Sequence, residues 1–228
     1  MAISPAWAAS TRVAVAANFT AVAEELAARF EAQSGHEIAL SFGATGQLYA
    51  QIWQGAPFDV LLSADVARTE QAIVDGLGVV GSDFVYALGR LVLYAPGREA
   101  NAETLRGEFL KLAIADPLTA PYGKAAQEVI AALGLSGVVE GKLVQGETIS
   151  QTLQFVESGN AELGFVALSQ VMGKDSIWVV PEALHSPIAQ GAVLLKQGAD
   201  NEAAVAFLDY LRSDEAVAVM LAAGYAVP

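Results

Sequence analysis

The sequence predicts an α/β protein made of two lobes, each a mostly parallel sheet flanked by helices. Three observations carry this prediction. Short Val-rich segments alternate with helical patterns, and this alternation occurs twice along the chain. Strand-rich segments near residues 88–95 and 188–195 interrupt it. We expect those two segments to cross between the lobes, and a single continuous sheet stays open as the alternative.

The first strand–helix run occupies the amino-terminal third of the chain. A short, buried strand is expected at 12–16, and Asn18 follows where a helix N-cap belongs. Apolar residues at helical spacing come next, and Ser34-Gly35 supplies a stop signal. Further strands are expected at 37–42 and 58–63, and further helices at 48–54 and 66–74.

The second run begins after a strand-rich stretch at 84–95. Its expected strands are 112–115, 142–145, 163–168, 177–180 and 188–195, and its expected helices are 123–133 and 149–156. Two closing helices, at 201–212 and 214–222, are expected to return to the first lobe. The predicted division is a residual leader at 1–10, lobe 1 at 11–87 with 196–228, and lobe 2 at 88–195.

The composition excludes several classes of protein. Of 228 residues, 54% are hydrophobic and 16% are charged, which favours a large packed core over disorder. Twelve basic against 25 acidic residues give a net charge of −13, so we expect no nucleic-acid partner and no anionic membrane surface. The chain has no cysteine, which excludes disulfides, thiolate metal sites and cysteine nucleophiles.

The amino terminus predicts export. Ser4-Pro5-Ala6-Trp7-Ala8-Ala9-Ser10 has alanines at the spacing that a signal peptidase reads, so it resembles the end of a secretory signal. A leader on a cytosolic protein is the alternative. No apolar run reaches the roughly 18 residues that a membrane span needs.

The loops between strands and helices indicate where a ligand would bind. In a parallel α/β sheet, ligands bind at the carboxyl ends of the strands, where helix N-termini offer free N–H groups and a partial positive charge. Three of the four loops of interest carry no charged residue. The loops are Ala17-Asn18-Phe19, Gly43-Ala44-Thr45-Gly46, Ala120-Pro121-Tyr122-Gly123 and Glu147-Thr148-Ile149-Ser150.

These loops are rich in neutral hydrogen-bond donors, namely the Asn18 amide and the Thr45, Tyr122 and Thr148 hydroxyls. Facing each other across a cleft, the four helix starts would bind an anion without any cationic side chain. Such a donor-only site favours a fully deprotonated guest. For each loop alone, an ordinary cap or turn is the alternative. The glycine patterns of nucleotide-binding loops are missing.

Six segments, in order and over nearly the whole chain, carry a family resemblance. They are Val13-Ala14-Val15-Ala16-Ala17-Asn18-Phe19, Leu40-Ser41-Phe42-Gly43-Ala44-Thr45-Gly46, Gly55-Ala56-Pro57-Phe58-Asp59-Val60-Leu61-Leu62-Ser63-Ala64-Asp65, Ala120-Pro121-Tyr122-Gly123, Leu163-Gly164-Phe165-Val166-Ala167 and Ala223-Gly224-Tyr225. In these segments the chain resembles the periplasmic molybdate-binding proteins.

The resemblance implies a two-lobe periplasmic-binding-protein fold with the ligand in a hinged interlobe cleft. It also implies a receptor that delivers molybdate, and also tungstate, to the membrane permease of an ABC importer. It places the first-lobe ligand positions on Asn18 and Thr45, where serine is commoner. The second-lobe positions fall on Tyr122 and on the backbone N–H of Ile149. The best-known members have a further tyrosine where this chain has Ala167, and Tyr122 is expected to replace it.

We therefore expect an exported, monomeric receptor that is not an enzyme and has neither a cofactor nor a metal site beyond the oxyanion. The expected ligand set is Ala17, Asn18, Thr45, Tyr122, Thr148 and Ile149. A sulfate- or phosphate-type receptor is one alternative.

A phosphate-handling hydrolase is the other alternative. It would use Asp65 or Asp116, which are expected at strand carboxyl ends. The favoured interpretation is that both carboxylates accept loop N–H bonds and turn away from the anion. His36 and His185 indicate neither a nucleophile–base pair nor a transition-metal site.

Overall fold

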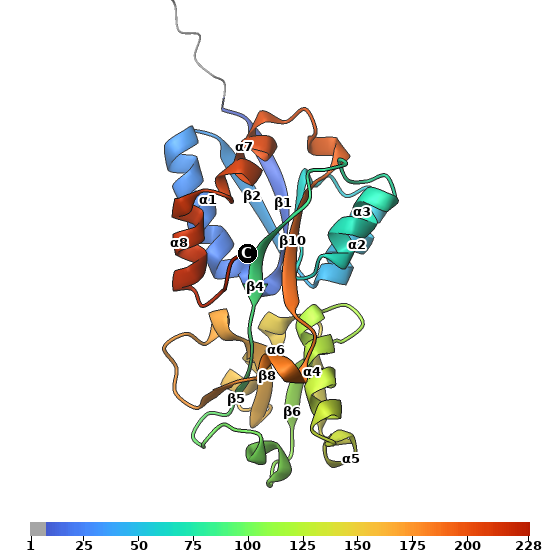
Figure 1. Cartoon of the computed structure of the whole chain (residues 1–228), viewed down its shortest axis with the longest axis vertical. Helices are drawn as coiled ribbons and strands as arrows, with labels where there is room; N and C mark the ends of the chain where they lie inside the picture. Colours follow the sequence, from blue (N-terminus) through green and yellow to red (C-terminus); the bar gives the residue numbers. More distant parts are fainter. Residues whose placement is uncertain (1–7) are drawn as a thin grey trace, which may run out of the picture.

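A computed structural model describes residues 8–228 as two α/β lobes stacked along the long axis of the molecule (Figure 1). The predicted leader at 1–10 falls mostly on residues 1–7, which lie outside the described residues. Each lobe has its own five-stranded sheet, which confirms the two-lobe α/β prediction. The single continuous sheet, kept open as the alternative, is wrong.

The first sheet has the strand order β2-β1-β3-β10-β4. Strand β1 pairs in parallel with β2 and β3, whereas β10 runs antiparallel to β3 and β4. The strands are β1 (Ser10–Ala16), β2 (Glu37–Gly43), β3 (Val60–Leu62), β4 (Phe84–Gly89) and β10 (Ile188–Leu194). The carboxyl ends of β1 to β3 point toward the second lobe (Figure 1).

The second sheet repeats this arrangement in the order β7-β6-β8-β5-β9. Strand β6 pairs in parallel with β7 and β8, and β5 runs antiparallel to β8 and β9. The strands are β5 (Leu91–Tyr94), β6 (Leu112–Ala115), β7 (Leu143–Gly146), β8 (Leu163–Ala167) and β9 (Ile177–Val179). Three parallel strands in each sheet thus feed helices that start at the lobe boundary.

Helices cover both sheets. The helices of the first lobe are α1 (Thr20–Ser34), α2 (Thr45–Trp53), α3 (Ala67–Val74), α7 (Glu202–Tyr210) and α8 (Asp214–Ala222). Those of the second are α4 (Pro121–Ala132), α5 (Ser136–Val139) and α6 (Ile149–Glu157). Short 3₁₀ turns occur at Ala17–Phe19, Glu103–Arg106, Leu168–Gln170, Glu182–Leu184 and Lys196–Gly198.

The carboxyl-terminal helices return to the first lobe, as predicted. Phe207 and Met220 are buried in one cluster with Phe19 and Leu26, so α7 and α8 complete the core beneath β1 and α1. Burying large apolar side chains of this kind contributes roughly 1.5–3 kcal/mol each. The predicted stop of α1 is also confirmed, because Gly35 takes a left-handed conformation with φ of 74°.

The chain passes between the lobes at Arg90, between β4 and β5, and again between β9 and β10. The second crossover differs from the predicted one, which ran through 188–195 and placed that segment in lobe 2. Strand β10 instead pairs with β3 and β4 over its length. An apolar strand fits the middle of either sheet, so its sequence did not specify its partners. We propose that lobe 1 comprises 8–89 and 188–228, and lobe 2 comprises 90–187.

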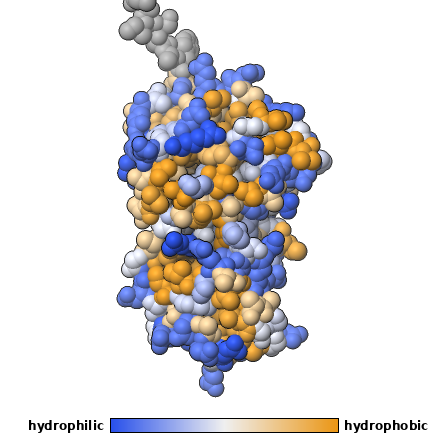
Figure 2. Space-filling model, in the orientation of Figure 1, coloured by the Kyte–Doolittle hydropathy of each residue, from blue (hydrophilic) through white to orange (hydrophobic). Residues whose placement is uncertain are grey.

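In the space-filling view, the outline of the molecule narrows where the two lobes meet (Figure 2). Among residues 8–228, none of the helices combines the length and the apolar character that a transmembrane span requires.

Candidate functional site

Four helix starts, two from each lobe, meet around one small cavity at the lobe boundary. The first lobe contributes the 3₁₀ turn Ala17–Phe19 that leads into α1, and the start of α2. The second lobe contributes the starts of α4 and α6. The cavity is lined by Ala16, Ala17, Asn18, Gly43, Ala44, Thr45, Ala64, Ala120, Pro121, Tyr122 and Ile149.

None of these lining residues is charged, in agreement with the neutral site predicted from the loops. The first N–H groups of each helix have no acceptor within that helix, and each helix start carries about half a positive charge. The cavity has a volume of about 10 Å³, which is the room of roughly one water molecule. Its uncharged, donor-rich lining is the feature that fits an anion.

Thr45 supplies a free hydroxyl donor. It is the first residue of α2 and is almost fully buried. Its Oγ1 accepts the N–H of Ala64 at 3.0 Å. A hydroxyl has one hydrogen to donate in addition to its acceptor sites, so the Thr45 O–H stays available to a guest in the cavity.

Tyr122 supplies the second hydroxyl. It is buried in the first turn of α4, and its Oη lies 3.5 Å from the Nε2 of Gln190, which donates to it. No described residue accepts the Tyr122 O–H. Burial, reinforced by Tyr225 and Tyr86 nearby, holds the pKa of Tyr122 well above 10, whereas the nearby side-chain amides of Asn18 and Gln190 act in the opposite direction. The hydroxyl therefore keeps its proton at any physiological pH.

Asn18 lines the cavity, but its side chain does not act as the predicted helix N-cap. Its Nδ2 donates to the Oε1 of Gln190 at 2.8 Å and to the Oη of Tyr225 at 3.0 Å. An amide nitrogen has only two hydrogens, so both predicted side-chain donors are engaged within the protein. What Asn18 presents to a guest is its backbone N–H in the first turn.

Thr148 is the one predicted ligand residue that does not line the cavity. Its hydroxyl accepts the N–H of Gln151 at 3.1 Å, which makes it the N-cap of α6. This is the ordinary capping role kept open as the alternative. Ile149, the next residue, does line the cavity with Ala17 and Tyr122.

Asp65 and Asp116 turn away from the cavity, as predicted. Asp65 Oδ1 accepts the N–H of Arg68 at 2.8 Å at the start of α3. Asp116 accepts the N–H of Leu118 at 3.0 Å and the hydroxyl of Thr119 at 3.2 Å. Neither residue is among those that line the cavity, so neither carboxylate is placed to act on a bound guest.

The lobes are closed on each other at the cavity. The Gly46 N–H donates to the Thr119 carbonyl at 2.8 Å, and the Ser150 hydroxyl donates to the Ala17 carbonyl at 3.1 Å. Both bonds join the first lobe to the second. A Cβ at Gly46 would lie 3.1 Å from the Cα of Thr119, so the lack of a side chain at Gly46 allows the two lobes to approach closely.

Three residues without a predicted role surround Asn18, namely Gln190, Tyr225 and Ser169. Gln190 and Tyr225 are buried, and Ser169 reaches Asn18 from the second lobe. The sequence did point to Tyr225, because it ends Ala223-Gly224-Tyr225, one of the six segments that carry the family resemblance. Nothing local marked Gln190, because an isolated glutamine within an apolar strand carries no motif.

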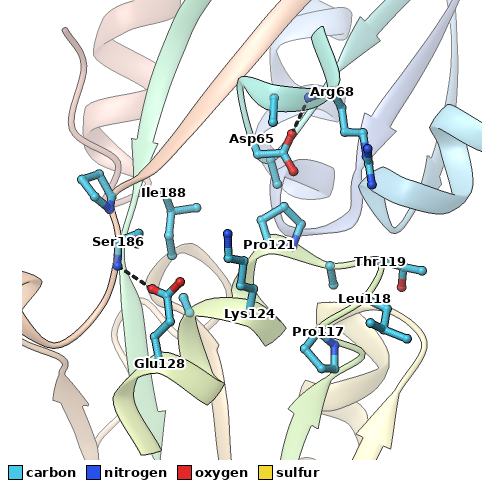
Figure 3. Close-up of a pocket in the computed structure, with 15 residues that line it drawn as sticks. Asp65, Arg68, Pro117, Leu118, Thr119, Pro121, Lys124, Glu128, Ser186 and Ile188 are labelled. Atoms are coloured by element: carbon cyan, nitrogen blue, oxygen red, sulfur yellow. Dashed lines mark hydrogen bonds between the residues drawn. The ribbon is translucent and has the colours of Figure 1, made fainter. Parts of the chain in front are cut away.

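A larger groove of about 270 Å³ opens beside the cavity and shares Ala64, Ala120 and Pro121 with it (Figure 3). Its lining mixes both signs of charge, with Lys124 rising from α4 beneath Asp65 (Figure 3). Glu128 accepts the N–H of Ser186 at 2.6 Å. Two carboxylates in its wall make this groove less suited to an anion than the neutral cavity.

In the described part of the chain, no group of three or more His, Cys, Asp or Glu side chains could hold a metal ion.

Comparison with known proteins agrees with this geometry. Residues 11–226 match the family model of bacterial extracellular solute-binding proteins. The molybdate-binding protein ModA of Rhodobacter capsulatus is 49% identical over 226 residues, covering 97% of this chain and 90% of that protein. The ModA of Azotobacter vinelandii is 50% identical over 229 residues, covering 96% and 91%.

Among solved structures, the periplasmic molybdate-binding protein of Azotobacter vinelandii superposes with a TM-score of 0.93 at 37% identity, covering 96% of this chain and 99% of that one. The chain therefore belongs to the bacterial extracellular solute-binding proteins and, within them, to the family of the molybdate-binding proteins.

Proposed function

We propose that the protein binds molybdate, and also tungstate, in the cavity between its lobes and delivers it to the membrane permease of an ABC importer. The observation that carries this proposal is the convergence of four uncharged helix starts on one compact cavity. The names of the relatives at 49% and 50% identity support the choice of anion.

Binding would rest on short hydrogen bonds to the four oxyanion oxygens. The proposed donors are the Thr45 and Tyr122 hydroxyls and the first-turn N–H groups near Ala17, Asn18 and Ile149. Hydrogen bonds to a charged acceptor contribute roughly 1.5–3 kcal/mol each. Thr148 is left out of this set, because its hydroxyl caps α6.

A net charge of −13 does not prevent such binding. Charges separated by more than a screening length of about 8 Å interact weakly at physiological salt. Inside the cavity the guest meets only neutral groups and helix N-termini, where hydrogen bonds are stronger than in water.

Export to the periplasm, action as a monomer and delivery to a permease are parts of the same proposal. The alanine-rich start of the chain and the periplasmic relative of known structure support the location. Closure of the two lobes around the anion would create the surface that a permease recognises.

A hydrolase is not favoured, because the carboxylates of Asp65 and Asp116 bond to their own loops and stay outside the cavity. Sulfate and phosphate remain the rival guests, and they share the tetrahedral shape of molybdate.

Isothermal titration calorimetry of the purified protein with sodium molybdate and sodium tungstate tests the proposal. We expect saturable binding of one anion per chain, and weaker binding in Tyr122→Phe, which lacks one donor. Absence of saturable binding at millimolar molybdate and tungstate in correctly folded protein would contradict the proposed function.

A further inference from the structure

We propose that Gln190 sets the direction of the hydrogen bond that Tyr122 makes in the cavity, and thereby selects a fully deprotonated oxyanion. Gln190 itself does not line the cavity and acts only through Tyr122. This inference deepens the proposed function and rests on it.

Gln190 occupies an unusual place in the fold. It is fully buried within β10, the strand that leads from the lobe crossover into the first sheet. The pairing of β10 with β4 shifts register here, because Tyr86 of β4 is left over between the pairs Gln190–Ala87 and Gly191–Val85. Such bulges are common beside functional sites. Burying a neutral amide there requires that its hydrogen bonds be made.

The Asn18 amide favours one orientation of the Gln190 amide. Gln190 Oε1 accepts Asn18 Nδ2 at 2.8 Å. The Tyr86 hydroxyl lies 2.9 Å from the same Oε1 and 3.2 Å from the Ser63 carbonyl, so its single hydrogen has two acceptors within reach. Flipping the Gln190 amide would turn its N–H₂ toward the Asn18 N–H₂, which opposes the flip.

The fixed amide directs its Nε2 at Tyr122. The Nε2 lies 3.5 Å from the Tyr122 Oη and donates to it. Both atoms pack over the bare backbone of Gly89, where an added Cβ would overlap the Tyr122 Oη and lie 2.9 Å from the Nε2. The Tyr122 hydrogen cannot point at the Gln190 N–H, and Gly89 lies on another side. On the present proposal, the O–H is therefore directed at the cavity that Tyr122 lines.

The chemical consequence concerns protonated guests. An anion with no hydrogen of its own can accept the Tyr122 O–H. Hydrogen phosphate carries an O–H that needs an acceptor. The Tyr122 oxygen already accepts the Gln190 N–H and donates its own hydrogen, so it has little capacity to accept another hydrogen bond. Gln190 therefore makes Tyr122 a donor and withholds an acceptor from the guest.

The test exploits a substitution of nearly identical shape. In Gln190→Glu, the carboxylate still accepts from Asn18 and Tyr86, but it accepts from the Tyr122 O–H as well. The tyrosine oxygen then faces the cavity as an acceptor. We expect molybdate affinity to fall roughly tenfold or more, and phosphate affinity to fall much less, so the molybdate-to-phosphate affinity ratio drops.

The measurement is calorimetric affinity for molybdate and phosphate in wild type, Gln190→Glu, Tyr122→Phe and the double variant, at one pH and salt. In the Tyr122→Phe background, Gln190→Glu is expected to leave the molybdate-to-phosphate affinity ratio unchanged, because no Tyr122 hydroxyl remains whose hydrogen bond could change direction. Equal losses for both anions, or a changed ratio that persists without the hydroxyl, would overturn the proposal, since Gln190 would then act through fold or charge.

Gln190→Met keeps the inference testable if a buried carboxylate prevents folding. Methionine is neutral and of similar length but donates nothing, so Tyr122 is free to rotate and the affinity ratio is expected to fall. If folded Gln190→Met had the same molybdate-to-phosphate affinity ratio as wild type, the role proposed for Gln190 would be contradicted. Failure of wild-type protein to bind molybdate or tungstate would contradict the proposed function instead.

Discussion

The hydroxyl of Ser169 lies 2.9 Å from the hydroxyl of Tyr225, and the two residues belong to different lobes. Ser169 follows β8 in the second lobe, whereas Tyr225 is buried in the first-lobe core after α8. Both hydroxyls also approach the carbonyl of Asn18, at 3.1 Å and 2.8 Å. The loop that begins α1 is thus held by the carboxyl-terminal segment and by the facing lobe together.

Tyr225→Phe is expected to weaken oxyanion binding without touching the anion. The substitution leaves Asn18 Nδ2 and Ser169 without this partner in the closed form, which costs roughly 1–3 kcal/mol, or about 5- to 150-fold in affinity. Dissociation rates measured by tryptophan fluorescence should rise. Tyr210→Phe is the matched control, because the buried Tyr210 hydroxyl has no hydrogen-bond partner in the described structure. Equal affinities in the two variants would contradict this role of the Tyr225 hydroxyl.

Thr45→Ala is expected to weaken binding by about 10- to 150-fold, because a hydroxyl donor to a charged acceptor is lost. Thr45→Ser keeps the hydroxyl and should stay near wild type. Thr148→Ala should instead cost about 1 kcal/mol of stability, since its hydroxyl caps α6. Calorimetry and thermal unfolding separate the two effects. A larger loss of affinity in Thr148→Ala than in Thr45→Ala would reverse the assignment.

Gly46→Ala is expected to hinder closure of the lobes. The added Cβ would press on the backbone of Thr119, 3.1 Å away, although Gly46 does not line the cavity. Small-angle scattering should record a decrease in radius of gyration when wild type binds molybdate, and a smaller decrease in Gly46→Ala. Gly137→Ala is the control, because nothing lies within 4 Å of a Cβ there. An unchanged wild-type profile at saturation would argue against hinge closure.

The tyrosines near the site should resist alkaline titration. Burial holds the pKa values of Tyr86 and Tyr122 well above 10 and raises that of Tyr225 to about 12. Unfolded tyrosine titrates near 10, so above that pH the unfolded chain binds fewer protons than the folded one. This stability is fully present below pH 10 and is lost as pH rises through the folded pKa values.

Absorbance at 295 nm follows this titration. We expect these tyrosines to ionise together with unfolding, as monitored by circular dichroism, rather than before it. Reversible ionisation of the full set near pH 10 in folded protein would show that the site is hydrated.

The sequence predicted the site's architecture better than the roles of its side chains. Strand–helix alternation places the starts of α1, α2, α4 and α6 at one boundary, and this depends only on local patterns. The role of Asn18 depends on Gln190, which lies 172 positions away in the chain. The local sequence therefore could not distinguish a helix N-cap from a member of a buried hydrogen-bond network. Thr148 shows the reverse case, since an ordinary cap resembled a ligand residue.

A cavity that offers only hydrogen-bond donors should select a compact, fully deprotonated oxyanion. Competition calorimetry on the wild-type protein measures this selectivity, with molybdate, tungstate, sulfate and phosphate compared at one pH and salt. We expect molybdate and tungstate to bind tightest. Sulfate should bind more weakly because its shorter bonds fit a fixed cage poorly, and phosphate should bind far more weakly than molybdate. Phosphate binding as tightly as molybdate would mean that an acceptor faces the cavity, and the donor-only site would be wrong.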